Sequence, residues 1–490
     1  MRKILAILMI LAMAFTCAAE AEQMESGDWL YTVNEDGSAT ISMYMGMEGN
    51  LAIPAELDGH PVKAIGKAAF AGNCDLLSVV IPEGVEAIGG GAFESCECLE
   101  SVSLPNGLLS IGTMAFCYCS SLEEITIPET VTTLGTNVVD NCDLITSVRI
   151  PNSVVNYSGP PVENLNVPTE IIVSPDHPVF EVVDGSLFDK TLKKLVAFRV
   201  GDRGASYDIP EGTEIIGVDA FQCASLQHIT IPESVKIIEK SAFAACELLE
   251  SLTLPEGVVS IGASAFSNCW EMKSINIPDG ATEIGDGIFQ GCTSLKDLRI
   301  SPDQPVLTLV DGVLFSKDLK RLIWYPPARG DKTYTVPAGT EVLGADAFEG
   351  AQFESIVIPD SVTSIGKSCF LWCTQLKEIT IPSGVTEIGH TLLCQCHSLQ
   401  KAVFPENMTE IPKYTFQDCK ALKHYEIPDS VTSIGACAFR GCDALESVVI
   451  HAGVEFIGDF AFDECPSLTV TVVPGSAVEQ YCLENGIPAK

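Results

Sequence analysis

Hydrophobic and polar positions follow a short pattern that returns every 23 residues, occasionally every 22, along most of the chain. In residues 99–122, LESVSLPNGLLSIGTMAFCYCSSL, Val102 and Leu104 alternate with serines. This period of two predicts a short strand with one face turned inward. Pro105 follows directly, and because it has no N–H to donate, it should end the strand.

The second half of the same unit spaces its apolar residues at steps of four, four and three. This spacing predicts one buried face of a short helical or 3₁₀ segment. The residues concerned are Ile111, Ala115, Cys119 and Leu122. Gly112 stands just before this segment, and we expect it to take a backbone conformation that other residues adopt only at a cost.

The repeat indicates a solenoid, because each coil can bury its apolar edge only against its neighbours. The predicted fold class is an α/β solenoid of 23-residue coils, with a parallel sheet on one face and short helical or 3₁₀ segments on the other. The element Ile-Gly-x-x-Ala-Phe, with its degenerate forms, begins at Ile65, Ile88, Ile111, Leu134, Ile216, Ile238, Ile261, Ile284, Leu343, Ile365, Ile388, Ile411, Ile434 and Ile457.

Two longer stretches interrupt the repeat and are copies of each other, with SPDHPVFEVVDGSLF beginning at Ser174 and SPDQPVLTLVDGVLF at Ser301. Each should hold an inserted hairpin of two strands, at VDGSLF and KKLVAF in the first copy and at the corresponding VDGVLF and KRLIWY in the second. We therefore divide the chain as follows: signal peptide 1–21, N-terminal cap hairpin 24–60, coils 61–160, insert with hairpin 161–209, coils 210–300, insert with hairpin 301–336, coils 337–473 and C-terminal cap 474–490.

The first 21 residues have the pattern of an export signal: two basic residues, an apolar run, and Ala19 and Ala21 before a cleavage point. No later segment reaches the roughly 18 to 20 continuous apolar residues that a membrane helix needs. Cys17 leaves open a lipid-modified N-terminus, although Ala14-Phe15-Thr16 before it does not fit the usual lipid-attachment motif. We expect a secreted protein, either free or held at the cell surface.

The pattern LxxIxIPxxVxxIGxxAFxxC resembles the BspA-like class of leucine-rich repeats. Residues 27–41, GDWLYTVNEDGSATI, are similar to the N-terminal cap hairpin of that family, and residues 472–488 are similar to its C-terminal cap helix. The resemblance implies a secreted or surface protein without enzymatic activity that takes part in adhesion and protein binding. The alternative is a structural spacer or self-associating surface protein without a foreign ligand.

The formal charge of −37 comes from 65 acidic and 28 basic residues that are scattered along the chain. Such a surface repels itself and disfavours nucleic acid or anionic membranes as partners. The sequence has no G-x-S-x-G, H-E-x-x-H or phosphate-binding glycine motif, so we predict no catalytic residues, no cofactor and no enzyme.

Cysteine is frequent, and we assign thirteen of the 20 to one repeat position, three residues before a leucine. A buried ladder of free thiols is the expected arrangement, because cysteine packs as a small apolar group. In an exported protein the alternative is a disulfide framework. The thirteen are Cys74, Cys96, Cys119, Cys142, Cys223, Cys246, Cys269, Cys292, Cys373, Cys396, Cys419, Cys442 and Cys465.

One dense group of zinc-type residues is His390, Cys394, Cys396 and His397. Since Cys396 already belongs to the ladder, we interpret the group as an ordinary coil with two surface histidines and predict no metal site. The outward strand positions form columns of small polar residues, for example Ser78, Ser101 and Ser147. These columns suit either a protein partner or plain solvation.

Basic residues gather in the two inserts, against the trend of the chain. One interpretation is that lysines protect exposed hairpin edges from pairing with other chains. The other is that the inserts bind an acidic partner, either a protein or polyanionic extracellular ligand or a second copy of the chain, with aromatic and arginine residues as anchors. The candidate partner-binding residues are Lys193, Lys194, Arg199, Lys320, Arg321, Trp324, Tyr325 and Arg329.

Overall fold

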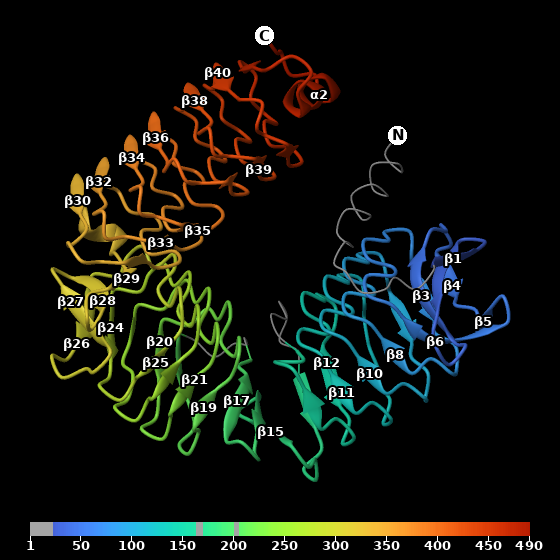
Figure 1. The fold of residues 1–490 in the computed structure, drawn as a ribbon. Helices are drawn as coiled ribbons and strands as arrows, with labels where there is room; N and C mark the ends of the chain where they lie inside the picture. Colours follow the sequence, from blue (N-terminus) through green and yellow to red (C-terminus); the bar gives the residue numbers. More distant parts are fainter. Residues whose placement is uncertain (1–22, 163–169, 200–204) are drawn as a thin grey trace. The chain divides into compact units, whose positions relative to one another are not determined.

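The computed structural model describes residues 23–162, 170–199 and 205–490. They divide into two compact units, one up to Leu187 and one from Phe188 onward. In each unit the chain runs through successive coils that stack on one another (Figure 1). The expected signal peptide, residues 1–21, lies outside the described residues and stays a prediction.

Two ladders of short parallel strands run through each unit. The strands of the first ladder end just before the repeat proline. In the first unit they are β4 (Asn50–Ala52), β7 (Ser78–Val80), β9 (Ser101–Ser103), β12 (Ser147–Ile150) and β14 (Glu170–Val173). In the second unit they are β18 (Ser206–Asp208), β20 (His228–Thr230), β22 (Ser251–Leu252), β24 (Ser274–Ile277), β26 (Asp297–Ile300), β30 (Thr333–Thr335), β32 (Ser355–Val357), β34 (Glu378–Thr380), β36 (Lys401–Val403), β38 (His424–Glu426), β40 (Ser447–Val449) and β42 (Thr469–Thr471).

The second ladder consists mostly of two-residue strands that end just before the repeat glycine. In the first unit they are β6 (His60–Ile65), β8 (Ala87–Ile88), β10 (Ser110–Ile111), β11 (Thr133–Leu134) and β13 (Asn156–Tyr157). In the second unit they are β17 (Lys194–Ala197), β19 (Ile215–Ile216), β21 (Ile237–Ile238), β23 (Ser260–Ile261), β25 (Glu283–Ile284), β29 (Arg321–Trp324), β31 (Val342–Leu343), β33 (Ser364–Ile365), β35 (Glu387–Ile388), β37 (Glu410–Ile411), β39 (Ser433–Ile434) and β41 (Phe456–Ile457). Ser110 pairs with Ala87 on one side and Thr133 on the other, so equivalent residues of neighbouring coils stack in register.

The predicted helical segments are wrong. Residues 113–118 form successive turns in which Met114 and Tyr118 have left-handed φ angles of 57° and 58°. Two left-handed residues four apart cannot belong to a right-handed helix. The N–H of Met114 instead donates to Thr136 O of the next coil at 2.8 Å, and the same pattern recurs in other coils. The four residues expected to share the buried face, Ile111, Ala115, Cys119 and Leu122, are all buried.

The expectation for Gly112 is also corrected. Its φ is not among the positive values, so no special backbone angle requires a glycine here. A Cβ atom on Gly112 would lie 2.5 Å from the backbone N of Gly90 in the preceding coil. The repeat glycine therefore sets how closely two coils can stack.

A column of phenylalanine rings fills the core between the turns and the strands. Phe93 and Phe116 stack with centroids 5.1 Å apart and planes within 2° of parallel. In the second unit Phe221, Phe243, Phe266 and Phe289 continue in the same way, at 5.0 to 5.9 Å. Phe93, Phe243 and Phe266 each lie between two equivalent rings, which explains why the repeat keeps phenylalanine at this position.

The second insert adds β27 (Leu307–Val310) and β28 (Val313–Ser316) as an antiparallel hairpin in front of β29. The turn between them is Asp311-Gly312, with φ of 51° and 80°. The predicted hairpin strands, around VDGVLF and KRLIWY, correspond to β28 and β29; the first strand, β27, was missed. The short 3₁₀ helix η1 (Pro327–Arg329) follows.

The first insert has the equivalent strands β15 (Phe180–Val183) and β16 (Ser186–Asp189). A buried polar side chain holds the start of each insert. His177 Nδ1 accepts the N–H groups of Val179 and Phe180, and its Nε2 lies 2.9 Å from Pro151 O. In the second insert Gln304 Oε1 accepts the corresponding N–H groups of Val306 and Leu307, while its amide nitrogen donates to a different carbonyl, Ala281 O, at 2.6 Å.

The described ends of the stack carry elements unlike the coils. At the first, β1 (Gln23–Ser26), β2 (Trp29–Val33) and β3 (Ala39–Tyr44) form an antiparallel sheet, and β5 (Glu56–Leu57) pairs with β6. Trp29 and Tyr44 cover the ring of Phe70. At the other end lies α2 (Ala477–Glu484), whose N-cap Ser476 accepts the N–H of Glu479 and which buries Val478 and Cys482.

Both ladders are interrupted near Pro412. In the regular coils on either side, Gly389 N–H donates to Ile365 O and Gly435 N–H to Ile411 O, each at 2.8 Å. Pro412 occupies the glycine position and has no N–H to offer to Ile388 O. Accordingly β35 does not pair with β37, and a hollow of about 190 Å³ lies between them. The first ladder also stops between β36 and β38.

Candidate functional site

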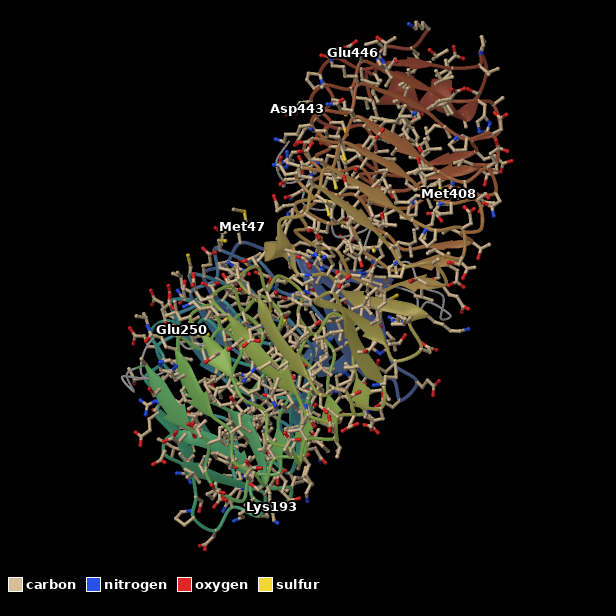
Figure 2. All side chains as sticks on the ribbon, turned by 90° about the vertical axis from the view of Figure 1, so that its left-hand side faces the viewer. Met47, Lys193, Glu250, Met408, Asp443 and Glu446 are labelled. Atoms are coloured by element: carbon tan, nitrogen blue, oxygen red, sulfur yellow. The ribbon has the colours of Figure 1, made fainter. Side chains whose placement is uncertain are left out.

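Most of the candidate basic residues of the two inserts lie beside acidic side chains, and two of them pair with an acid of the following coil. Lys193 Nζ is 2.5 Å from Glu214 Oε1, and Lys320 Nζ is 2.7 Å from Glu341 Oε1, two pairs that correspond in the duplicated inserts. Lys193 lies at the periphery of its unit (Figure 2). Hydrogen bonds from Lys193 and Lys236 lower the pKa of Glu214 to about 2.

Three further candidates are paired in the same way. Lys194 lies 2.7 Å from Glu239, in a pair whose side chains are only 13% and 28% exposed. Arg321 lies 2.6 Å from Asp286, and Arg329 contacts Asp331. Arg199 is half-buried at the end of a described stretch. The positive charge of the inserts is therefore largely balanced inside the chain, which weakens its pull on an outside polyanion.

Trp324 and Tyr325 do not serve as exposed anchors. Their exposed fractions are 5% and 1%, because they continue the ring column across the insert. Trp324 meets Phe289 edge to face at 5.4 Å, and Tyr325 lies 5.5 Å from Phe348. The Tyr325 hydroxyl donates to Asp331, and burial raises its pKa.

The thiol ladder is present with eleven members rather than thirteen. The Cys269 thiol donates to Phe243 O at 3.2 Å, and ten other cysteines make the same bond at 3.0 to 3.2 Å. Cys74 and Cys223 lie one position off this column and are exposed. Counting from the core phenylalanine, their places in the ladder are taken by Asn73 and Ala224.

All nineteen cysteines in the described part of the chain are free thiols. Burial raises the pKa of Cys96 and of Cys142 to about 12, so these thiols stay protonated at neutral pH. A protonated buried thiol is a poor nucleophile and a poor metal ligand. The ladder is thus a packing element that also ties coils together.

The residues of the zinc-type group are used elsewhere. The Cys396 thiol donates to Phe370 O, and His390 Nδ1 lies 2.8 Å from the Thr391 hydroxyl. Among the residues that the structure describes, no three His, Cys, Asp or Glu side chains are placed to hold a metal ion. Within the same residues, no helix has the length and apolar composition needed to cross a bilayer.

The outer face of β18, β20, β22, β24 and β26 carries exposed polar columns, as predicted from the strand pattern. One column contains His228, Ser251, Ser274 and Asp297, and the other Thr230, Thr253, Asn276 and Arg299; each of these side chains is exposed or half-buried. The Asn276 amide bonds both the N–H and the O of Leu254 at 2.8 and 2.9 Å. It therefore takes the place of backbone pairing beside the short strand β22.

This outer face is hollowed. Two cavities of about 450 and 470 Å³ adjoin along it and share Glu256 and Asn276 in their walls. One is also lined by His228 and Thr253, and the other by Arg299 and by Leu309 of the second insert. Both volumes lie within the range of ordinary ligand pockets.

Three valines alternate with polar residues in the same column in the last third of the chain. Val357, Val403 and Val449 are 53%, 40% and 43% exposed on β32, β36 and β40. The sequence analysis did not recognise these valines as exposed apolar residues, although each directly follows an inward-facing isoleucine, alanine or valine in the sequence.

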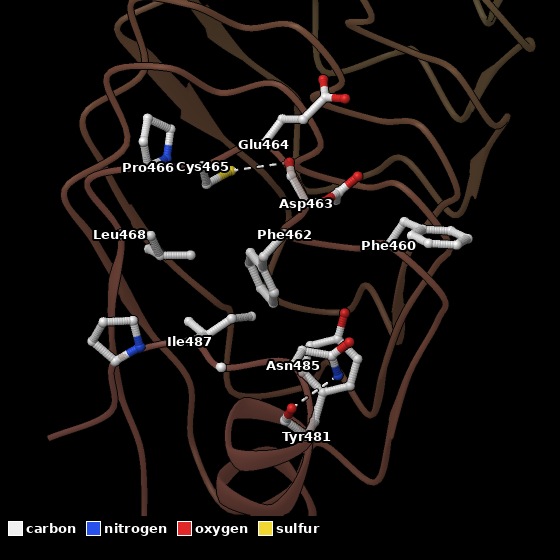
Figure 3. A pocket seen from close by; sticks show the side chains of 12 residues that line it. Phe460, Phe462, Asp463, Glu464, Cys465, Pro466, Leu468, Tyr481, Asn485 and Ile487 are labelled. Atoms are coloured by element: carbon white, nitrogen blue, oxygen red, sulfur yellow. Dashed lines mark hydrogen bonds between the residues drawn. The ribbon is translucent and has the colours of Figure 1, made fainter. Parts of the chain in front are cut away.

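A further hollow lies between the last coil and α2 (Figure 3), with a volume of about 470 Å³. Phe462 stands at its centre, Tyr481 and Asn485 reach it from the helix side, and Cys465 lines its opposite wall. Phe460, beside it, is 56% exposed. No pattern in the sequence predicted this hollow, because the repeat describes single coils and not how the cap meets the last coil.

A pair of buried acids lies beside the second insert. Asp346 and Glu349 are 6% and 5% exposed. Burial and the neighbouring charge of Asp346 raise the pKa of Glu349 to about 8, so this carboxyl is protonated at neutral pH. The pair affects stability rather than forming a site, and it too was missed in the sequence.

Comparison with known proteins identifies the repeat. A family model described as the BspA type leucine rich repeat region matches residues 59–171, 206–322 and 341–469. No curated protein matches the chain significantly.

Several solved structures are similar to the chain. A leucine rich cell surface protein from Faecalibacterium prausnitzii is 25% identical, with 95% of this chain and 98% of that chain covered and a TM-score of 0.37. A leucine-rich repeat protein from Eubacterium ventriosum is 18% identical, with coverage of 90% and 93% and a TM-score of 0.41. One from Bacteroides ovatus is 22% identical, with coverage of 95% and 99% and a TM-score of 0.30.

Proposed function

We propose that this chain, which belongs to the BspA-type leucine-rich repeat family, is a secreted, non-enzymatic binding module of the adhesion type that holds a protein partner on the outer face of β18 to β26. The observation that carries the proposal is the pair of adjoining hollows on a face whose side chains are polar and exposed. A surface that is both hollowed and rich in hydrogen-bonding groups is suited to protein recognition.

The test is retention of extracellular matrix and cell-surface proteins by the immobilised mature chain. Ser251→Arg with Thr253→Arg places two long charged side chains in the hollowed face, and both positions are exposed, so the fold should persist. Ser103→Arg, at the equivalent strand position of the first unit, is the matched control. We expect the double variant to lose the retained protein and the control to keep it. If the unaltered chain retains nothing, the structural spacer is the better description.

The inserts are a second candidate contact surface, with Lys193 and Lys320 as the more accessible charges. Their side chains are 61% and 55% exposed despite their acidic partners. Reversal of Lys193, Lys194, Lys320 and Arg321 to Glu should weaken binding or self-association at low salt more than at physiological salt, because screening reduces charge attraction. Lys273→Glu with Lys377→Glu is the control, since both lysines are exposed and paired but lie outside the inserts.

Export itself is part of the proposal. Expression of the full chain with its first 21 residues should yield a processed protein whose N-terminus is Glu22. An uncleaved N-terminus, or a lipid attached to Cys17, would contradict release of the protein by cleavage after Ala21.

A further inference from the structure

Cys442 and Cys465 meet at the C-terminal end of the thiol ladder. The carbonyl oxygen of Phe439 accepts the S–H of Cys465 at 3.1 Å and the N–H of Cys442 at 3.3 Å. The two cysteines therefore share one acceptor atom. The two cysteines lie outside the strands, but the strand ladders stack neighbouring coils at a spacing of about 4.8 Å. This spacing falls inside the range of roughly 4.4–6.8 Å between the Cα atoms of a disulfide.

Cys465 is the accessible member of the ladder. The other ten ladder cysteines are buried, whereas Cys465 is half-buried. It lines the hollow between the last coil and α2 (Figure 3), through which a small oxidant can reach its sulfur. Oxidation in this ladder should therefore begin at Cys465, because susceptibility follows exposure.

The last coil also has freedom to move. Cys465 belongs to a coil that is followed by the cap helix rather than by another coil, so one of its sides faces a hollow of about 470 Å³. Ladder pairs further inside, such as Cys246 and Cys269, belong to coils that are stacked on both sides. A small approach of Cβ atoms, which an S–S bond requires, meets less resistance at the end of the stack.

From this geometry we infer that Cys442 and Cys465 are a redox-sensitive pair that a peroxide converts into a reversible disulfide, which fastens the last coil to the one before it. Peroxide oxidises the Cys465 sulfur to a sulfenic acid and releases one water. The buried Cys442 thiol is a poor nucleophile towards molecules in solution, but it lies in the coil next to the sulfenic acid. Its sulfur attacks the Cys465 sulfur and forms the S–S bond, while its proton passes to the departing hydroxyl, which leaves as a second water. Two thiols lose two electrons and two protons, and one hydrogen peroxide becomes two waters.

The experiment treats the folded mature chain with hydrogen peroxide, blocks the remaining thiols by alkylation, and maps the peptides by mass spectrometry. We expect a linked peptide pair containing Cys442 and Cys465, and full recovery of these two thiols on treatment with dithiothreitol. Two variants accompany it. Cys465→Ser keeps a donor for Phe439 O and should abolish the linkage, while Cys98→Ser changes a half-buried cysteine outside the ladder and should leave it unchanged.

Four outcomes would overturn the inference. The first is sulfinic or sulfonic acid on Cys465 without a linkage, and the second is a disulfide between another pair. The third is a disulfide between Cys442 and a different cysteine in Cys465→Ser, and the fourth is no reaction of the folded chain. Circular dichroism of each variant before oxidation checks that its coils are intact, so that a lost linkage reports the chemistry and not unfolding. The result is independent of partner binding on the strand face.

Discussion

The thiol of Cys269 donates to the carbonyl oxygen of Phe243, 26 residues earlier, at 3.2 Å. One side chain thereby satisfies a backbone acceptor of the preceding coil in a place where no strand pairing reaches. A thiol is a weak donor, but it also fills the space of a small apolar residue. This double use explains why cysteine recurs at this position, close to the core phenylalanine of each coil.

The ring column gives the first prediction. Phe266 is fully buried between Phe243 and Phe289, with centroids 5.6 and 5.9 Å away. Phe266→Ala should lower the free energy of unfolding by about 3–5 kcal/mol through lost transfer energy and the cavity left behind. Urea unfolding followed by circular dichroism measures it. Phe456→Ala, at a ring that is 62% exposed, should change stability by less than about 0.5 kcal/mol; similar effects at both positions would contradict the column.

The second prediction concerns thiol reactivity. In denaturant, an aromatic disulfide reagent should detect nearly all of the nineteen cysteines that follow the predicted cleavage point, because the structure holds them as free thiols. In the native chain it should react quickly only with accessible ones such as Cys74 and Cys223. A low count after denaturation would instead indicate a disulfide framework.

Coil spacing gives the third prediction. A Cβ atom on Gly389 would lie 2.2 Å from the backbone N of Lys367. Gly389→Ala should therefore force the coils apart and cost roughly 1–3 kcal/mol, the usual range for overpacking. At the equivalent position of the next coil, Pro412 already carries a Cβ atom, so Pro412→Ala should cost less than about 1 kcal/mol. Thermal unfolding of the two variants compares them, and equal destabilisation would argue against the spacing role.

The duplicated inserts give the fourth prediction. Because Gln304 accepts the corresponding backbone N–H groups as His177 does, His177→Gln should keep the first insert folded and change stability by less than about 1 kcal/mol. His177→Ala leaves buried N–H groups without an acceptor and should cost about 1–3 kcal/mol. Denaturant titration distinguishes them; a severe loss in the glutamine variant would show that the two inserts are held differently.

The fifth prediction is a pH dependence. Glu349 has a folded pKa of about 8, raised by burial and by Asp346, and an unfolded value near that of a model glutamate. The unfolded chain thus loses this proton first as the pH rises. The contribution of Glu349 is fully present at low pH and is lost between roughly pH 4.5 and 8, at up to about 1.4 kcal/mol per pH unit.

The measurement compares the unfolding free energy of the wild type and Glu349→Gln across this range. We expect the difference to grow in favour of the glutamine variant as the pH rises towards 8 and to level off above it. Glu354→Gln is the control: because Lys377 lowers the pKa of Glu354, this carboxylate titrates below the range, and its variant should show a difference that does not change with pH between about 4.5 and 8. A difference that does not depend on pH would mean that Glu349 ionises normally in the folded chain.

Much of the fold could be read from the sequence because a 23-residue period constrains every coil at once. The inward positions Ile111 and Ala115 and the strand before Pro105 were identified from spacing alone. The local conformation between them was not, because steps of four, four and three fit a helix as well as a chain of turns. The left-handed backbone of Met114 and Tyr118 distinguishes the turns from a helix, and neither methionine nor tyrosine predicts such a backbone.

The candidate site was harder to predict, because exposure depends on neighbours that a sequence does not display. Lysines 193 and 320 look like free charges until Glu214 and Glu341 of the next coil are placed beside them. Trp324 looks like an anchor until Phe289 is found against it. The hollows near Asn276 arise from how coils meet, and the repeat pattern describes single coils.

Pro412 has a mechanical consequence. The strand side of its coil lacks pairing with β35, yet the turn side keeps its bonds, since Thr391 N–H donates to Lys413 O and Leu393 N–H to Thr415 O at 2.9 Å. The two coils are therefore joined by hydrogen bonds along the turn edge and can separate along the strand edge. When this unit bends, it should open at the strand edge beside Pro412 while the turns act as the hinge, so the proline sets both the place and the direction of flexing.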